Sequence, residues 1–258
     1  MCLVVIALDV HPRFALAVAA NRDEFHARAA LPARWGDTPP FSGILAGRDL
    51  EAGGTWLGAR RDGRWALITN VRDRQRHHDS EAPSRGELVP AILNDQAAPA
   101  TALAAVMRTA QPYNGFNLLA GDADSATWAS NRASHPQALA AGVHGLSNAL
   151  LDTPWPKLAR TKGAIAAWAA RGGDDLSPVF AALADQTRAP DDALPATGVP
   201  LEWERLLSAP FIVSEDYGTR CSTVLVIARN GAARFVERSF DARGNVTGEV
   251  GFEFEVPT

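Results

Sequence analysis

Met1-Cys2-Leu3-Val4-Val5-Ile6-Ala7-Leu8 opens the chain with an apolar run, and Phe14–Ala20 is a second run of the same kind. Between them lies Asp9–Arg13, a short polar connection that contains Pro12. Apolar runs of this length joined by a polar turn predict a hairpin of two buried strands. This hairpin decides the fold class, because strand-like runs return at the other end of the chain.

The C-terminal part of the chain is also predicted to be β-structure. Asn230-Gly231 between two apolar runs is a strong hairpin signal. The strands predicted here are Ser222–Ala228, Ala233–Ser239 and Val246–Val256. The helices predicted in the middle of the chain are Leu88–Leu93, Thr101–Thr109, Pro156–Ala170 and Pro178–Gln186. Strands at both ends with helices between them predict one α+β domain over residues 1–258, its first strands central in a sheet that the last strands complete.

Three segments before the first predicted helix carry local signals. Ile44–Gly58 contains five glycines counted with Gly43, which predicts turns and close approaches of the backbone. Ser84-Arg85-Gly86-Glu87 has the spacing of a capping box and predicts the start of the helix that follows it. Trp65–Val71 is a further predicted strand, entered through the turn signal Asp62-Gly63.

The amino-acid composition excludes several classes of function. The chain has 258 residues, 47% hydrophobic and 21% charged, as in globular proteins with a large core. A net charge of -4 argues against nucleic acid as a partner. Two cysteines far apart predict neither a disulfide framework nor a zinc site, and fit a reducing cytoplasm. We expect no signal peptide and no membrane span, and the abundance of Ala and Arg suggests a GC-rich bacterial genome.

The sequence allows two interpretations of Cys2, one catalytic and one structural. If the initiator methionine is removed, Cys2 carries both a thiol and a free α-amine, whose unperturbed pKa near ~8 lets it act as a base at neutral pH. A nucleophile activated by its own terminal amine is a known catalytic arrangement. On position alone, Cys2 is more often a small buried side chain at the start of a strand.

The polar tetrad Asn21-Arg22-Asp23-Glu24 favours the catalytic reading. It is expected directly after the second strand, and a hairpin returns the end of its second strand to the start of its first. Cys2 and the tetrad should therefore be neighbours. A guanidinium beside a thiol lowers the pKa of the thiol, and a carboxylate can hold an ammonium group in place. The alternative is a solvated turn with a salt bridge.

Several motifs together resemble one family. They run in order along almost the whole chain: Met1-Cys2, Ala19–Phe25, Gly53–Gly58, Leu67–Asn70, Ser84–Val89, Tyr113–Leu118, Gly145–Leu158 and Tyr217–Arg220. In this combination the chain resembles the NRDE family, also called the transport-and-Golgi-organisation-2 family, which is similar to N-terminal-nucleophile hydrolases. The resemblance implies a four-layer αββα sandwich, in which two antiparallel sheets pack face to face between helical layers.

The resemblance also implies roles for residues that match the motifs. In cysteine amidases of this type the terminal cysteine attacks an amide carbonyl, while an arginine and an aspartate after the second strand position the thiol and the amine. Cys2, Arg22 and Asp23 hold those places in this sequence. No cofactor and no metal are expected for this chemistry.

Three further site residues follow from the same resemblance, and a fourth, Trp56, follows from the glycines that precede it. Asn148 and Asn70 are the candidates for donating hydrogen bonds to an oxyanion, a contribution of about 10²–10³ in rate for each donor. Without the family match, both asparagines would be read as turn or strand-end residues. Arg220 matches a late arginine near the site, and Trp56 is expected to form an apolar wall for substrate.

The predicted function is therefore a cysteine N-terminal-nucleophile hydrolase or acyltransferase that acts on a linear amide or related acyl bond of a small molecule. The alternative is a carrier or chaperone for haem or an acyl-lipid, because the family has been linked to both. In that case Cys2, His26 or His144 are candidate iron contacts. No Cys-x-x-Cys-His segment supports tight haem attachment.

Overall fold

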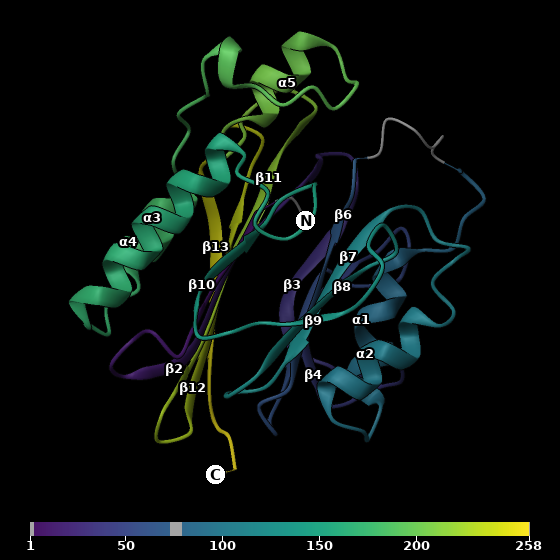
Figure 1. The fold of residues 1–258 in the computed structure, drawn as a ribbon, viewed down its shortest axis with the longest axis vertical. Helices are drawn as coiled ribbons and strands as arrows, with labels where there is room; N and C mark the ends of the chain where they lie inside the picture. The colour runs from purple at the N-terminus through teal and green to yellow at the C-terminus, as the bar shows by residue number, and fades with distance from the viewer. Residues whose placement is uncertain (1–2, 73–78, 258) are drawn as a thin grey trace.

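Two antiparallel β-sheets packed face to face form the centre of the computed structural model, which describes residues 3–72 and 79–257 (Figure 1). Within those residues the first sheet has six strands in the order β10-β1-β2-β11-β12-β13. Their bounds are Gly142–Leu146, Leu3–Leu8, Phe14–Phe25, Tyr217–Ala228, Ala232–Phe240 and Val246–Glu255. The prediction that the first strands are central and the last strands complete the sheet is confirmed.

The second sheet has seven strands in the described part of the chain, in the simple order β3 to β9. Their bounds are Ala30–Trp35, Ile44–Asp49, Leu57–Arg60, Trp65–Asn70, Phe116–Gly121, Ala126–Ser130 and Gln137–Ala138. The glycine-rich stretch before Gly58 was expected to form turns, yet it contains β4 and leads into β5. The glycines allow close packing there: a Cβ on Gly47 would overlap the ring of Trp56.

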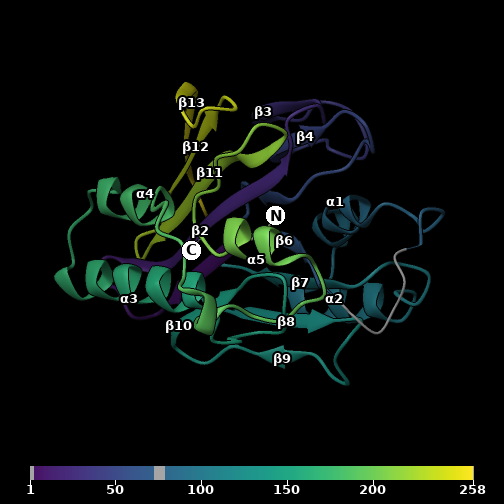
Figure 2. The same ribbon diagram turned by 90° about the horizontal axis from the view of Figure 1, so that it is seen from above.

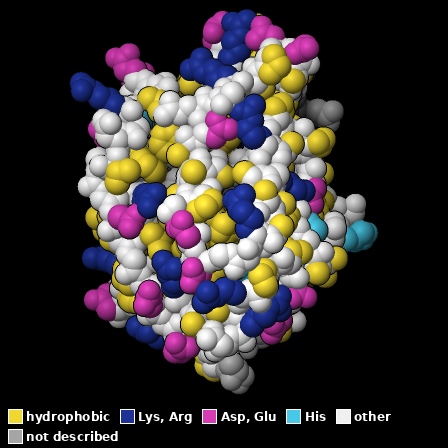
Figure 3. Space-filling model, turned by 90° about the vertical axis from the view of Figure 1, so that its left-hand side faces the viewer, with side chains coloured by type: hydrophobic (Ala, Val, Ile, Leu, Met, Phe, Trp, Pro, Cys, Tyr) yellow, Lys and Arg dark blue, Asp and Glu magenta, His cyan; other side chains and the backbone are white. Residues whose placement is uncertain are grey.

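Helices cover the outer face of each sheet (Figure 2). The first sheet is covered by α3 (Pro156–Arg171) and α4 (Ser177–Leu183), and the second by α1 (Leu88–Asn94) and α2 (Pro99–Met107). The predicted αββα sandwich is thus confirmed. The face formed by α3 and α4 carries interspersed acidic and basic side chains (Figure 3). In the described residues no helix is long and apolar enough to cross a membrane.

Alternation of side chains along β1 shows how the layers are built. Val4, Ile6 and Leu8 belong to the core between the two sheets, whereas Leu3, Val5 and Ala7 pack under α3 and α4. Successive side chains of a strand point to opposite faces, so a strand buried on both faces must be apolar at every position. This explains the unbroken apolar run at the start of the sequence.

Three local predictions are wrong or incomplete. The tetrad Asn21–Glu24 does not follow the second strand but lies inside β2, because β11 pairs with it and supplies hydroxyl partners. Ser84 caps no helix with its side chain, and Glu87 instead accepts a hydrogen bond from Tyr113. Helix α5, Leu201–Leu207, was not predicted. Its seven residues are too short to show a clear helical period.

Candidate functional site

Strand β2 divides the four tetrad side chains between its two faces. Arg22 and Glu24 line a cavity, whereas Asn21 and Asp23 belong to the alternate face. Asn21 is completely buried and donates from Nδ2 to the carbonyls of Leu183 (2.8 Å) and Pro210 (2.9 Å). Its Oδ1 accepts a hydrogen bond of 2.6 Å from Ser222. Asn21 therefore joins β2 to three other parts of the chain.

Asp23, the predicted holder of the terminal amine, is also buried. Its Oδ1 accepts a hydrogen bond of 2.7 Å from Thr219 Oγ1. The same hydroxyl accepts a hydrogen bond from the Ile212 backbone N–H, so it serves both as donor and acceptor. Asp23 is thus held firmly on the face of β2 opposite Arg22.

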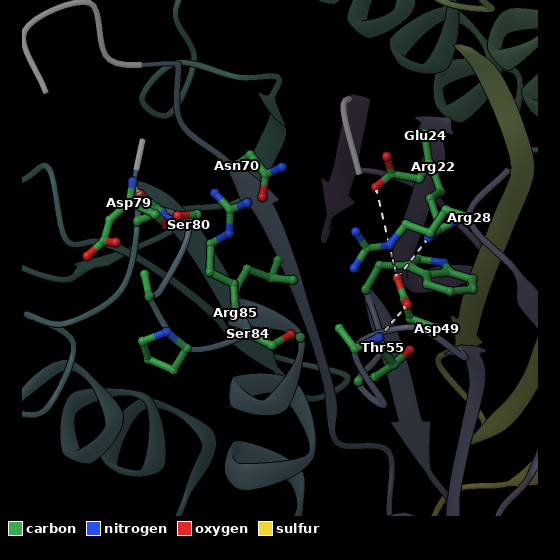
Figure 4. Close-up of a pocket in the computed structure, with 18 residues that line it drawn as sticks. Arg22, Glu24, Arg28, Asp49, Thr55, Asn70, Asp79, Ser80, Ser84 and Arg85 are labelled. Atoms are coloured by element: carbon green, nitrogen blue, oxygen red, sulfur yellow. Dashed lines mark hydrogen bonds and ion pairs between the residues drawn. The ribbon is translucent and has the colours of Figure 1, made fainter. Parts of the chain in front are cut away.

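The front cavity, as we call the cavity lined by Arg22 and Glu24, has a volume of about 310 Å³. Figure 4 shows its two walls: the β2 and β4 side chains lie on one side, and Asn70 with the segment 79–86 lies on the other. Gly54 and Gly86 touch across its floor, where a Cβ on Gly54 would lie 2.5 Å from the Gly86 backbone. Only glycine at that position allows the two walls to approach so closely.

Charged groups are concentrated on the first wall. Asp49 Oδ2 accepts hydrogen bonds from Arg22 Nη2 (3.0 Å) and Arg28 Nε (2.7 Å). Burial by itself raises the pKa of Asp49, but hydrogen bonds from Arg28 and from the Ala52 backbone, with the charges of both arginines, bring the pKa below its usual value. Asp49 is therefore a carboxylate, and it fixes the position of the buried Arg22 side chain.

Trp56 completes this wall. The Arg22 guanidinium lies over the Trp56 ring, 4.5 Å from its centroid, in a cation–π contact. Trp56 is only 5% exposed and lines the front cavity, the place that the sequence predicted for it. Whether it touches a substrate stays a prediction.

The two predicted oxyanion donors are neighbours. Asn70 ends β6 and lines the front cavity. Asn148 lies behind it: Asn148 Nδ2 donates to the Asn70 backbone carbonyl (2.9 Å), and Asn148 Oδ1 accepts from Arg72 Nη2 (3.2 Å). The structure therefore brings Arg22, Trp56 and Asn70 to one cavity with Asn148 next to it.

Arg220 lies in a different place. It is the extra residue at a bulge of β11, between Thr219 and Cys221. Its Nη1 donates to the carbonyls of Phe25, His26 and Arg28, at distances of 2.9 to 3.1 Å. It does not line the front cavity but a second one, described below. Cys2 lies outside the described residues, so its predicted role stays a prediction.

Sequence reasoning missed Arg28, Asp49 and Arg85 as residues of the front cavity. Asp49 and Arg28 are 21 positions apart and belong to different segments, so nothing in their local sequence indicates an ion pair. Arg85 stands in the supposed capping box, and its Nη1 donates to the Gly115 carbonyl (3.0 Å). The one feature of the sequence that could have pointed to Asp49 is the glycine pair Gly53-Gly54 after it, which marks a tight turn beside a buried strand.

The histidines proposed as iron contacts have other partners. His26 Nε2 lies 3.1 Å from the Ser214 carbonyl oxygen. His144 Nδ1 lies 3.0 Å from Asp152 Oδ2, and its Nε2 lies 2.9 Å from the Ala140 carbonyl oxygen. Within residues 3–72 and 79–257, no group of three or more His, Cys, Asp and Glu side chains could hold a metal ion.

Cys221 is expected to be chemically inert in the folded protein. Its side chain is buried, and burial together with nearby Glu237 raises the pKa of the thiol well above its usual value. Since the thiolate is the reactive form, iodoacetamide at pH 7.5 should modify Cys221 roughly 10²-fold or more slowly than a thiol in solution. Peptide mapping after timed alkylation measures this rate, with urea-unfolded protein as control. Equal rates in folded and unfolded protein would contradict the burial argument.

Comparison with known proteins agrees with this architecture. The sequence profile of the Transport and Golgi organisation 2 family matches residues 1–242. The Transport and Golgi organization protein 2 homolog of Bos taurus is 36% identical over 263 residues, covering 93% of each chain. The homolog of Homo sapiens is 34% identical over 261 residues with the same coverage. Both relatives are from animals, so they give no support to a bacterial origin.

Two solved hydrolases have a similar fold. A Caenorhabditis elegans ortholog of N-acylethanolamine-hydrolyzing acid amidase has a TM-score of 0.51 at 12% identity, and the match covers 87% of this chain and 92% of that chain. The mutant C2A conjugated bile acid hydrolase from Clostridium perfringens has a TM-score of 0.54 at 10% identity, and the match covers 98% of this chain and 92% of that chain. At these identities the likeness concerns the fold, which is that of N-terminal-nucleophile hydrolases.

Proposed function

The chain belongs to the Transport and Golgi organisation 2 family, and from this premise we propose that it is a cysteine N-terminal-nucleophile hydrolase or acyltransferase. Its substrate is a small molecule with a linear amide or related acyl bond, and its nucleophile is Cys2 after removal of Met1. The observation that carries the proposal is the buried Arg22, fixed by Asp49 at the cavity end of β2.

Strand pairing supports the placement of the nucleophile. Leu3, the first residue of β1, pairs with Asn21 of β2, and Arg22 is the next residue along β2. Neighbouring Cα atoms are about 3.8 Å apart, so Cys2 is tied by one peptide unit to the strand position beside Arg22. A guanidinium beside a thiol favours the thiolate over the thiol.

The proposed reaction has two steps. In the first, the α-amine of Cys2 takes the thiol proton, the sulfur attacks the acyl carbon, and a tetrahedral oxyanion forms. The amine then returns the proton to the leaving nitrogen or oxygen, which departs and leaves a thioester on Cys2. In the second step, water or an acceptor attacks the thioester, and the thiol is regenerated.

Asn70 and Asn148 are the proposed oxyanion donors. An amide group has two N–H hydrogens. One hydrogen of Asn148 is used for the Asn70 carbonyl, which also holds the end of β6 in position. Side-chain donors aimed at the oxyanion are worth a few kcal/mol each in transition-state stabilisation. On the amine side, Asp23 is the proposed anchor, since Thr219 already fixes the orientation of its carboxylate.

The solved relatives of this fold suggest the reaction type. One is described as hydrolysing N-acylethanolamines and the other conjugated bile acids. The second carries alanine in place of a cysteine at its second position. The shared fold motivates the assignment of an acyl bond to this chain, and a cytoplasmic location stays a prediction from the cysteine content.

Mass spectrometry tests the proposal. Protein from the native host should lack Met1, and incubation with a panel of N-acyl amino acids, short amides and acyl thioesters should add one acyl mass to the peptide that begins with Cys2. An intact Met1 on all of the protein would remove the terminal-amine mechanism. If no acyl adduct forms and haem or an acyl-lipid binds saturably regardless of Cys2, the carrier alternative takes its place.

A further inference from the structure

A second cavity lies behind the Arg22–Trp56 contact. This rear cavity has a volume of about 240 Å³ and shares only Arg22 and Trp56 with the front cavity. Its other lining residues come from β3, β11, β12, β13 and their ends: Ala30, Leu31, Pro32, Arg220, Cys221, Glu237, Ser239, Phe240 and Thr247. The stacked Arg22 and Trp56 side chains therefore lie at the boundary that the two cavities share.

Two guanidinium groups line the rear cavity, and each has an unsatisfied N–H. Arg22 is 3% exposed, and no residue in the described part of the chain accepts a hydrogen bond from its Nη1. Arg220 Nε is also buried and has no acceptor among the described residues. Buried donors without partners are costly, by about 1–3 kcal/mol each, and are uncommon in folded proteins.

Arg220 also has no carboxylate partner among the residues that the structure describes. Its acceptors are three backbone carbonyls, which carry no charge. Burial lowers the pKa of Arg220, and the nearby charge of Arg22 lowers it further. Among the described residues Arg22 forms an ion pair with Asp49, which it shares with Arg28. Glu24 acts on Arg220 through its charge without forming an ion pair with it within the described part of the chain, so the positive charge at the rear cavity is balanced only in part.

The acidic residue in this cavity already has its own hydrogen-bond donors. Glu237 is almost completely buried, and burial raises its pKa. Its oxygens already accept hydrogen bonds from the Ala33 backbone N–H (2.7 Å) and Thr223 Oγ1 (3.0 Å). The Cys221 thiol beside it is neutral. An anion from outside would pair with both guanidinium groups through their unpartnered N–H groups.

We propose that the rear cavity binds the anionic group, a carboxylate or a phosphate, of the compound whose acyl bond lies in the front cavity. This inference rests on the proposed function, because it assigns the substrate class of the same site. Ala30, Leu31, Pro32 and Phe240 give the chamber apolar walls, which suit a compact apolar body that ends in the charged group. Charge-assisted bonds from guanidinium to carboxylate or phosphate are among the strongest in proteins.

Binding of three matched probes to the Cys2→Ala protein, measured by calorimetry, tests the inference. Benzoate and phenyl phosphate carry the anion, whereas benzamide has nearly the shape of benzoate without its charge. We expect the better anion to bind about tenfold or more tightly than benzamide, and the preferred anion identifies the group as carboxylate or phosphate. Equal affinity for all three probes would overturn the inference.

Substitutions at Thr247 test whether the anion binds in the rear cavity. Thr247 is exposed on the edge strand β13, so its replacement should not disturb the fold. Thr247→Glu places a carboxylate beside the guanidinium groups and should weaken anion binding about tenfold, while Thr247→Gln, of the same shape, should leave it within about twofold. If Thr247→Glu leaves anion binding unchanged, the rear cavity is not the anion site.

The two proposals fail in different ways. A neutral acyl substrate that forms the Cys2 adduct while all three probes bind equally would keep the enzyme and reject the anion site. Anion binding that follows the Thr247 variants, without any acyl adduct, would keep the anion site and reject the enzyme. Arg220→Gln adds a third variant and should reduce binding of the anions alone, with exposed Arg108→Gln as its control.

Discussion

Replacement of Cys2 by alanine is expected to abolish turnover of an acyl substrate, with a loss in kcat of roughly 10³-fold or more. The thiol supplies the bond that forms in the transition state. Binding of the substrate should change little, because a small group is removed and the cavity walls remain. Steady-state kinetics together with calorimetric binding to the variant measures both quantities.

The control for this substitution is Cys221→Ala. It removes the second thiol from the core between the sheets, where it is buried and neutral. It should lower stability slightly and leave kcat within about threefold, since loss of one buried sulfur costs about 1 kcal/mol. Full activity of the Cys2→Ala protein, or equal losses in the two variants, would show that Cys2 is not the nucleophile.

Replacement of Asn21 by alanine is expected to destabilise the fold by about 3 kcal/mol. The change leaves the Leu183 and Pro210 carbonyls and the Ser222 hydroxyl without their buried partner. Each lost buried partner costs about 1–3 kcal/mol, and the three share one side chain, so their costs do not add fully. Urea unfolding followed by tryptophan fluorescence gives the free energy of unfolding.

Two further variants calibrate the Asn21 result. Ser222→Ala removes one of the three contacts and should cost about 1 kcal/mol. Asn94→Ala changes an exposed asparagine, whose Nδ2 donates to the Pro40 carbonyl at the surface, and should stay within about 1 kcal/mol. Destabilisation by Asn21→Ala no larger than that of Asn94→Ala would show that the Asn21 contacts contribute little to stability.

The sequence predicts that the first strands are central in a sheet and that the last strands complete it, because apolar runs and hairpin turns are local signals. It does not predict which face of β2 each tetrad residue occupies. Every position of Leu3–Leu8 is apolar, because both faces of β1 are covered. The strand therefore shows no alternation of polar and apolar residues from which the face of each side chain on the neighbouring β2 could be deduced. The opposite orientations of Asp23 and Arg22 are visible only in the structure.

The sequence likewise predicts only some of the residues of the candidate site. Arg22 and Asn70 were proposed from a family resemblance and Trp56 from the glycines that precede it, and the structure places all three at the front cavity. The ion pairs around Asp49 depend on contacts between distant segments, which a single sequence does not encode in any local pattern. Arg220 shares a motif with the other site residues, yet the bulge in β11 directs it to the rear cavity.

The pairing of β2 with β11 also has a consequence for how the protein is made. Asn21 emerges from the ribosome early, but its strand neighbour Ser222 follows some 200 residues later. The N-terminal hairpin must therefore wait, with one strand edge unpaired, until nearly the whole chain has been synthesised. Such distant pairings slow folding, and an unpaired apolar edge invites aggregation. Chaperone dependence during synthesis, and intolerance of C-terminal truncation, are expected from this topology.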